Sequence, residues 1–196
     1  NATQPPPMIP WPALNVDKKN QNQLIKKLGL DSGRPVIAFF PGAEYGPAKQ
    51  WPLENFRDLA SEIIKKGYQI WIFGGPQDKK HGSFITQGGS DHVCNLAGKT
   101  SLNDAIDLIA AADMAVTNDS GLMHIAAALG VHVEAIYGAT TPDYTPPLTP
   151  RKNIHYLGVD CSPCFKRKCP LPHFNCMRDI SVSMVMESLS RAAAGS

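Results

Sequence analysis

A glycine-containing loop that ends in lysine is the first segment whose residues could bind a phosphate group. Residues 41–52 include Gly42, Gly46 and Lys49 and follow an apolar run. Glycine lets a backbone turn tightly and approach a ligand, and a lysine ammonium attracts a phosphate. A Walker A loop, and with it a magnesium-dependent nucleoside triphosphatase, is disfavoured because Gly46 is not followed by lysine and then serine or threonine. From this loop alone, a phosphate-binding Lys49 and a solvated surface lysine are equally good interpretations.

A second candidate phosphate site lies at residues 118–124, where a polar turn meets a run of small apolar residues. Asp119 or Ser120 could cap a helix beginning at Gly121, and Gly121 leaves the N–H groups of the first turn open to an anion. The aligned peptide dipoles add about +0.5 charge at a helix start. These features suit a pyrophosphate. The alternative is an ordinary helix cap, with His124 one turn into the helix and without a ligand.

Two further polar loops could complete a pocket. Residues 137–147 form a proline-stiffened loop that includes Thr140 and could be either a pocket wall or a rigid connector. Asp78, in the loop 74–78, could accept hydrogen bonds from ribose hydroxyls or cap the next helix. If all these loops follow strands of one sheet, they converge on one crevice. Together they indicate a site for a nucleotide diphosphate.

The segments between these loops alternate between strand-like and helix-like patterns. Continuous apolar runs predict buried strands, and apolar residues at helical spacing predict helices. The expected strands span residues 36–40, 68–73, 114–117, 131–137 and 154–157. The expected helices span residues 17–28 (capped by Asp17 and ended by Gly29), 53–66, a segment beginning at Ser101, 121–129 and 180–193. This alternation predicts an α/β fold, a Rossmann-like parallel sheet with helices on both faces and ligands at the carboxyl ends of its strands.

Length and composition indicate one globular domain. The chain has 196 residues, of which 43% are hydrophobic and 18% charged, and its net charge is +2. These values exclude a wholly disordered chain and give no electrostatic reason to expect nucleic acid as a partner. No apolar run approaches the roughly 20 residues that a transmembrane segment needs, and the N-terminus lacks a secretory-signal pattern. A cytoplasmic protein is therefore expected.

Prolines dominate the start of the chain, which favours an extended linker over residues 1–14. The nucleotide-binding domain is then expected to span residues 15–196. A linker in first position suggests that another domain precedes it, so we expect the chain to be the second half of a larger protein. A flexible tail is the alternative interpretation.

Four of the five cysteines crowd into a loop at residues 160–178. They are Cys161, Cys164, Cys169 and Cys176. The first two form a C-x2-C pair of the kind that grips zinc, but a six-residue gap replaces the usual second pair. Three interpretations stay open: a structural zinc site, one or two disulfides formed on oxidation, and reduced thiols. The fifth cysteine, Cys94, is expected to be a small buried hydrophobe near a strand.

Three of these segments together resemble glycosyltransferase family 9, the ADP-heptose:lipopolysaccharide heptosyltransferases. They are residues 40–52 (FPGAEYGPAKQWP), residues 117–124 (TNDSGLMH), and the Tyr-Gly pair at 137–138 with TPPL at 145–148. The resemblance covers about residues 12–148. It implies a GT-B enzyme of two Rossmann-like domains that inverts the sugar and needs no metal or other cofactor for transfer. Such an enzyme moves heptose from ADP-heptose onto the lipopolysaccharide inner core, peripherally at the cytosolic face of the inner membrane of a Gram-negative bacterium.

The resemblance implies roles only for residues of the C-terminal, donor-binding half. The N-terminal acceptor domain, which carries the family's catalytic base, is absent from this chain, so no catalytic residue is assigned here. The donor phosphates are expected at Lys49, Asp119, Ser120, Gly121, Leu122 and His124. The rest of the donor pocket is expected at Gly42, Ala43, Asp78, Lys99, Thr100, Ser101, Leu102 and Thr140, with the adenine on the 98–102 loop. The alternative functions are a freestanding ADP-binding regulatory module and a zinc-stabilised interaction domain.

Overall fold

A computed structural model describes residues 10–31 and 33–195 of the chain. Six strands form one sheet in the order β3-β2-β1-β4-β5-β6, and every neighbouring pair is parallel. The strands are β1 (Val36–Phe40), β2 (Gln69–Ile72), β3 (Val93–Asn95), β4 (Met114–Asn118), β5 (His132–Ile136) and β6 (Lys152–His155). The predicted fold class is confirmed.

Both faces of the sheet are buried, which explains why its central strand β1 is an uninterrupted apolar run. In β1, Val36, Ala38 and Phe40 point into one apolar cluster, whereas Ile37 and Phe39 point into the other. This alternation is the period-two geometry of a strand. Two hydrophobic layers therefore fix the sheet between its helices.

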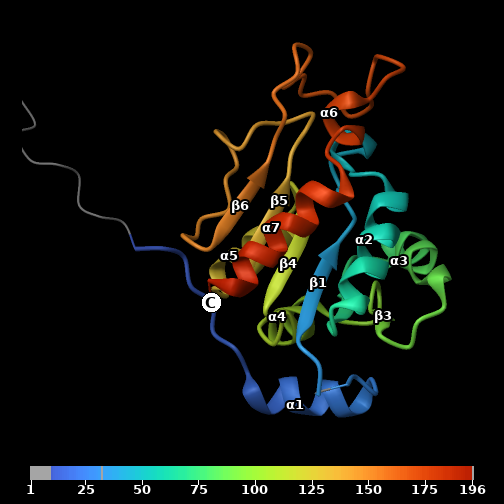
Figure 1. Cartoon of the computed structure of the whole chain (residues 1–196). Coiled ribbons are helices and arrows are strands. Elements are labelled where there is room, and N and C mark those ends of the chain that lie inside the picture. The colour runs from blue at the N-terminus through green and yellow to red at the C-terminus, as the bar shows by residue number, and fades with distance from the viewer. Residues whose placement is uncertain (1–9, 32, 196) are drawn as a thin grey trace, which may run out of the picture.

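Helices cover each face of the sheet (Figure 1). The first face packs against α1 (Lys18–Lys27), α4 (Leu102–Ile109) and α5 (Gly121–Ala128). The second packs against α2 (Leu53–Lys65), α3 (Lys79–Ile85) and α7 (Val182–Ala194), and the short helix α6 (Asn175–Arg178) precedes α7. In the described part of the chain, no helix is both long enough and apolar enough to cross a membrane.

Most expected elements are confirmed within two residues, including the caps of the first helix. Asp17 accepts hydrogen bonds from the backbone N–H groups of Lys19 and Asn20, and Gly29 ends the helix at φ +63°. β3 and α3 were not predicted. β3 has only three residues, all half-buried, so it lacks the apolar run that marks a central strand. β6 begins two residues earlier than the expected strand at 154–157.

The expected linker lies partly outside the described residues, which begin at residue 10. In its described part, the Leu14 N–H donates a 3.1 Å hydrogen bond to the Ala128 carbonyl at the end of α5. The Trp11 ring lies 5.8 Å from the ammonium of Lys152. The boundary between linker and domain stays a prediction.

The strand order reverses between β1 and β4, which makes the carboxyl ends of these two strands the place where such sheets bind ligands. Their register pairs Phe40 with Thr117, so the loops that follow both strands start side by side. These are the two loops with the sequence features of phosphate binding.

Candidate functional site

A buried amide joins the two central loops. The side chain of Asn118, at the end of β4, donates a 2.7 Å hydrogen bond to the Pro41 carbonyl and accepts a 2.9 Å bond from the Trp51 N–H. Asn118 is fully buried, and so is Trp51. One side chain thus fixes both ends of the 41–52 loop relative to the start of α5. We did not assign it a role from the sequence.

Lys49 and Asp119 form an ion pair across this crevice. The Lys49 Nζ lies 2.5 Å from Asp119 Oδ2, and the two side chains are 13% and 4% exposed. Asp119 also accepts hydrogen bonds from the hydroxyls of Thr140, at 2.7 Å, and Thr145, at 3.2 Å. Asp119 therefore does not cap α5, as one interpretation of the sequence had it. Its carboxylate holds the lysine of the 41–52 loop at the helix start.

The first turn of α5 is left without a side-chain cap. Ser120 precedes the helix in an extended conformation, and its side chain makes no capping hydrogen bond. A β-carbon built on Gly121 would meet no atom within 4 Å. The uncapped N–H groups and the helix dipole suit this turn to binding an anion. Lys49, held by the Asp119 carboxylate next to Ser120, places an ammonium group beside it.

A cavity of about 330 Å³ opens on the same turn. It brings together seven of the residues expected to bind the donor: Gly42, Ala43, Asp78, Leu102, Ser120, Gly121 and Leu122. Lys49, Asp119 and Thr140 do not line it. Lys49 and Thr140 contact the Asp119 side chain, and Asp119 is followed in the chain by Ser120, which does line it. The lining combines glycine-rich backbone with the apolar residues Phe40, Phe73 and Ile125, which suits a ligand with both a charged and an apolar part.

The remaining expected donor residues do not line the cavity; they are Lys99, Thr100, Ser101 and His124. Ser101 caps α4 by accepting a hydrogen bond from the Asp104 N–H, and Lys99 and Thr100 precede it without lining the cavity. Leu102 is 60% exposed at the edge. His124 is exposed one turn along α5. The adenine-binding role of this loop and the phosphate role of His124 stay predictions.

Asp78 closes its own turn instead of capping the next helix. Its Oδ2 accepts a 2.8 Å hydrogen bond from the Gly75 N–H, and it makes no cap bond to α3. A β-carbon at Gly42 or Gly74 would come within 2.8 Å of the Asp78 carboxyl group. Glycine is therefore required at both positions for the carboxylate to reach the cavity wall. Its role towards a ribose stays a prediction.

Tyr137 anchors the loop that follows β5. Its hydroxyl donates a 2.6 Å hydrogen bond to the Thr145 carbonyl. Burial and then the negative charge of Asp119 raise the pKa of Tyr137, so the phenol stays protonated and keeps this bond. The loop at residues 137–147 is thus tied both to the sheet and to the Lys49–Asp119 pair, but none of its residues lines the cavity.

The cysteine-rich loop, residues 160–178, packs against the same edge. The Phe165 N–H donates to the Ala139 carbonyl at 2.8 Å, and the Ala48 N–H donates to the Arg167 carbonyl at 3.1 Å. Gly46 makes this contact possible: its φ of +152° disfavours other residues, and a β-carbon there would collide with the Arg167 carbonyl oxygen. The loop therefore supports the Lys49 segment from outside.

All four thiols of this loop are free in the structure, and so is that of Cys94, which lies half-buried in β3. Burial raises the pKa of Cys176 to about 11, and the neighbouring Cys161, Cys169 and Cys164 add to the rise. The four sulfurs thus gather in one region. Even so, in the described ranges no three His, Cys, Asp or Glu side chains are placed so that they could hold a metal ion.

Zinc at this loop therefore stays a prediction from the cysteine spacing. Metal analysis of protein purified without chelator tests it. A stoichiometric metal would support the prediction, and less than about 0.2 metal ions per chain would end it.

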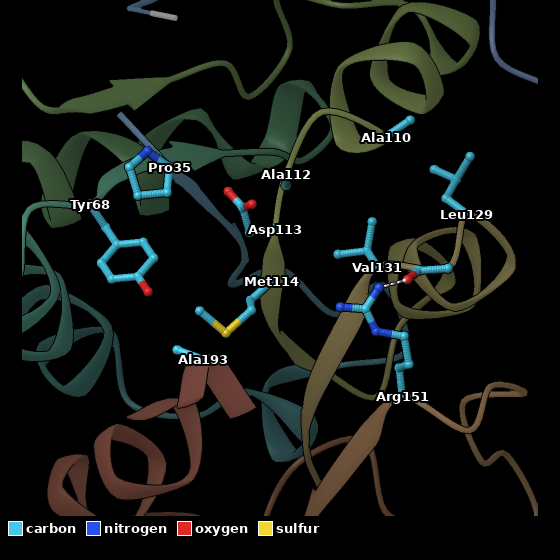
Figure 2. A pocket seen from close by; sticks show the side chains of 11 residues that line it. Pro35, Tyr68, Ala110, Ala112, Asp113, Met114, Leu129, Val131, Arg151 and Ala193 are labelled. Carbon is cyan, nitrogen blue, oxygen red and sulfur yellow. Dashed lines mark hydrogen bonds between the residues drawn. The ribbon is translucent and has the colours of Figure 1, made fainter. Parts of the chain in front are cut away.

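A second cavity, of about 380 Å³, lies at the opposite edge of the sheet (Figure 2). Its residues Pro35, Tyr68, Asp113 and Arg151 all precede strands, so it lies away from the carboxyl ends where such sheets bind ligands. Its charged groups already serve the fold: Asp113 accepts a hydrogen bond from the Val36 N–H, and Arg151 donates to a backbone carbonyl. The cavity on α5 is the better candidate site.

Comparisons with known proteins identify the family of the chain. The family described as glycosyltransferase family 9 (heptosyltransferase) matches residues 4–175. Lipopolysaccharide heptosyltransferase 2 of Escherichia coli (strain K12) is 39% identical over 190 residues, which are 95% of this chain and 54% of that protein. Lipooligosaccharide heptosyltransferase 2 of Haemophilus influenzae is 46% identical over 151 residues, 73% of this chain and 44% of that protein.

A solved structure shows the same fold. The structure of E. coli ADP-heptose lps heptosyltransferase II has a TM-score of 0.82 and 37% identity, over 96% of this chain and 55% of that one. The chain thus spans about half the length of the curated relatives that it matches.

Proposed function

Because this chain belongs to glycosyltransferase family 9, the heptosyltransferases, we propose that it is the donor-binding part of an enzyme that transfers heptose from ADP-heptose to the lipopolysaccharide inner core. The observation that carries the proposal is the uncapped start of α5 beside the ammonium of Lys49, at the carboxyl edge of the sheet. The similar E. coli structure is that of an ADP-heptose lps heptosyltransferase II. No comparison supports a freestanding regulatory module.

The chemistry explains why the donor half needs these groups. In the proposed transfer, an acceptor hydroxyl oxygen forms a bond to the anomeric carbon of heptose while the bond from that carbon to the phosphate oxygen breaks. The electron pair leaves with ADP, so negative charge grows on the diphosphate. The N–H groups of α5 and Lys49 stabilise that charge without a metal ion, because they are already oriented before the reaction begins.

The rest of the reaction belongs to residues outside this chain. The proton of the acceptor hydroxyl must pass to a base, and the family resemblance assigns that base and most of the acceptor site to the N-terminal half. A position at the cytosolic face of the inner membrane follows from the proposed acceptor and from the donor's location in the cytoplasm. Each of these points is part of the proposal.

A transfer assay on the full-length protein tests the proposal. Wild-type enzyme should move heptose from ADP-heptose to an inner-core acceptor, and Lys49→Ala should lower kcat about a hundredfold, since removing one such stabilising group costs about 3 kcal/mol. Lys66→Ala, on the exposed end of α2, is the matched control and should leave kcat unchanged. Circular dichroism and melting temperature report whether each variant folds.

Two results would contradict the proposal. If the wild-type enzyme releases no ADP in the presence of both substrates, the proposed transferase activity is contradicted. If a folded Lys49→Ala variant keeps the wild-type kcat/KM, the proposed role of Lys49 is contradicted, but the family assignment still stands.

A further inference from the structure

Aromatic and basic side chains form an exposed surface beside the candidate site. The ring of Tyr144 stacks on that of Phe165, with centroids 5.6 Å apart and 30° between the planes, and the two residues are 76% and 43% exposed. Lys166, Arg167 and Lys168 follow directly and are all exposed. We call these five residues the aromatic-basic patch.

The three cations of the patch have no anionic partner in the structure. Among residues 10–31 and 33–195, no carboxylate lies within ion-pairing distance of Lys166, Arg167 or Lys168. The stacked rings of Tyr144 and Phe165 are also exposed to water, although burying their apolar surface would be more favourable. A surface that combines unpaired cations with a flat apolar platform suits a ligand that has both negative charge and an apolar face.

The patch is fixed to the backbone around it. The Phe165 N–H donates to the Ala139 carbonyl, at the base of the loop that carries Tyr144. The Tyr45 hydroxyl donates a 2.9 Å hydrogen bond to the Phe165 carbonyl. The rings are thus held by two neighbouring segments and form a preorganised platform.

The patch also borders the expected position of the donor phosphates. The Tyr45 ring has the Lys49 ammonium 5.1 Å from its centre and the Arg167 guanidinium 5.2 Å from its centre. Arg167 therefore lies one aromatic ring away from the lysine of the candidate site. A molecule bound on the patch would therefore lie close to a donor whose diphosphate is held at Lys49.

Resting on the function proposed above, we propose that the aromatic-basic patch binds the acceptor and that its ligand is an anionic saccharide. The C–H face of a sugar ring would pack on Tyr144 and Phe165, and its carboxylate or phosphate groups would contact Lys166 and Lys168. The position of the patch favours an acceptor over a general membrane contact, because the acceptor must reach the donor sugar. The donor half thus contributes to acceptor binding.

Acceptor kinetics of the full-length enzyme test this inference. The double variant Lys166→Glu, Lys168→Glu should raise the KM for a purified inner-core lipopolysaccharide acceptor at least tenfold and leave the KM for ADP-heptose within twofold of wild type. Tyr144→Ala should also raise the acceptor KM, whereas Tyr144→Phe keeps the ring and should restore it. The matched control, Lys19→Glu with Lys26→Glu on exposed positions of α1, should change neither KM.

Each other outcome overturns the inference. Unchanged acceptor KM in an active double variant overturns it and leaves the proposed function standing. Donor and acceptor KM rising together, with a lower melting temperature, would assign the patch to a contact with another part of the longer protein. Unchanged transfer to a delipidated acceptor with lost binding to phosphatidylglycerol vesicles would assign it to the membrane surface. An inactive wild-type enzyme removes the proposed function and this inference with it.

Discussion

Single side chains in this protein hold the candidate site together from positions that look ordinary in the sequence. Asn118 is one residue of a strand end, yet its amide bonds to the backbone on both sides of the 41–52 loop. Asp119 looks like a helix cap but serves instead to hold Lys49 and two threonine hydroxyls. The sequence shows the types of these residues but not their partners, because the partners in the 41–52 loop lie more than 60 positions away in the chain.

The amide of Asn118 yields a prediction about stability. Asn118→Ala should lower the free energy of unfolding by about 2–4 kcal/mol, because it leaves the Trp51 N–H and the Pro41 carbonyl buried without partners. Urea unfolding measures the change. Asn55→Ala, which removes only a 3.5 Å contact to the Ile180 carbonyl, should cost less than about 1 kcal/mol. Equal effects of the two substitutions would contradict this role of Asn118.

Among the elements, α5 shows the conflict between stability and binding most clearly. A helix gains stability from an acidic residue in its first turn, but an acidic residue there would repel a diphosphate. Gly121→Asp should therefore raise the free energy of unfolding by about 0.5 kcal/mol and weaken ADP binding more than about tenfold. Differential scanning fluorimetry and calorimetry follow the two quantities separately.

A carboxylate added far from the site serves as the control for the negative charge that Gly121→Asp introduces. Asn22→Asp adds the same charge at an exposed position of α1, at the amino edge of the sheet (Figure 1), and should leave ADP binding unchanged. If Gly121→Asp binds ADP as tightly as Asn22→Asp does, the start of α5 is not the phosphate site.

The sequence was sufficient for the elements that are buried on both sides and insufficient for the peripheral ones. β1 is a continuous apolar run and β4 begins with three apolar residues, so the extent of both strands was predictable. β3 lies at the edge with half-buried residues, and α3 carries glycine and polar residues, so neither has a clear period. The position of the 160–178 loop beside Lys49 was not predictable, because backbone hydrogen bonds at Ala48 and Ala139 place it.

For the molecule as a whole, one buried charge links the edge of the sheet to the last helix. Glu134 in β5 is fully buried. It accepts hydrogen bonds of 2.9 Å from His132, 2.8 Å from Asn153 and 2.7 Å from His155, the last two in β6. Burial alone would raise the pKa of Glu134, but hydrogen bonds from these residues and from Ser188 in α7 lower it to about 2.

This cluster predicts how stability depends on pH. A carboxyl group whose pKa falls from 4.5 to about 2 on folding stabilises the protein above pH 4.5, and that contribution disappears as pH falls towards 2. At pH 7, Glu134→Gln should lower the free energy of unfolding by about 3 kcal/mol. Near pH 3, urea unfolding should show most of the difference from wild type gone. Glu62→Gln, at an exposed position of α2, should show no comparable pH dependence. A difference that stays constant from pH 7 to pH 3 would contradict the assignment.

In the proposed enzyme, the candidate site is one side of a larger active site. The chain spans about half of its relatives, and both its candidate phosphate site and its aromatic-basic patch lie at the carboxyl edge of the sheet. The motifs at 41–52 and 117–124 made this half recognisable, because their glycines and charges are not explained by packing in the core alone.

The central claim is that Lys49 and the start of α5 hold the diphosphate of the donor, and calorimetric titration of ADP tests it most directly. Lys49→Ala should bind ADP at least about tenfold more weakly than wild type, while AMP, which lacks the second phosphate, should bind both proteins about equally. Adding Asp119→Asn removes the carboxylate left unpaired by the first substitution, and the double variant should remain weak. Wild-type ADP affinity in Lys49→Ala, or its full recovery in the double variant, would contradict the account.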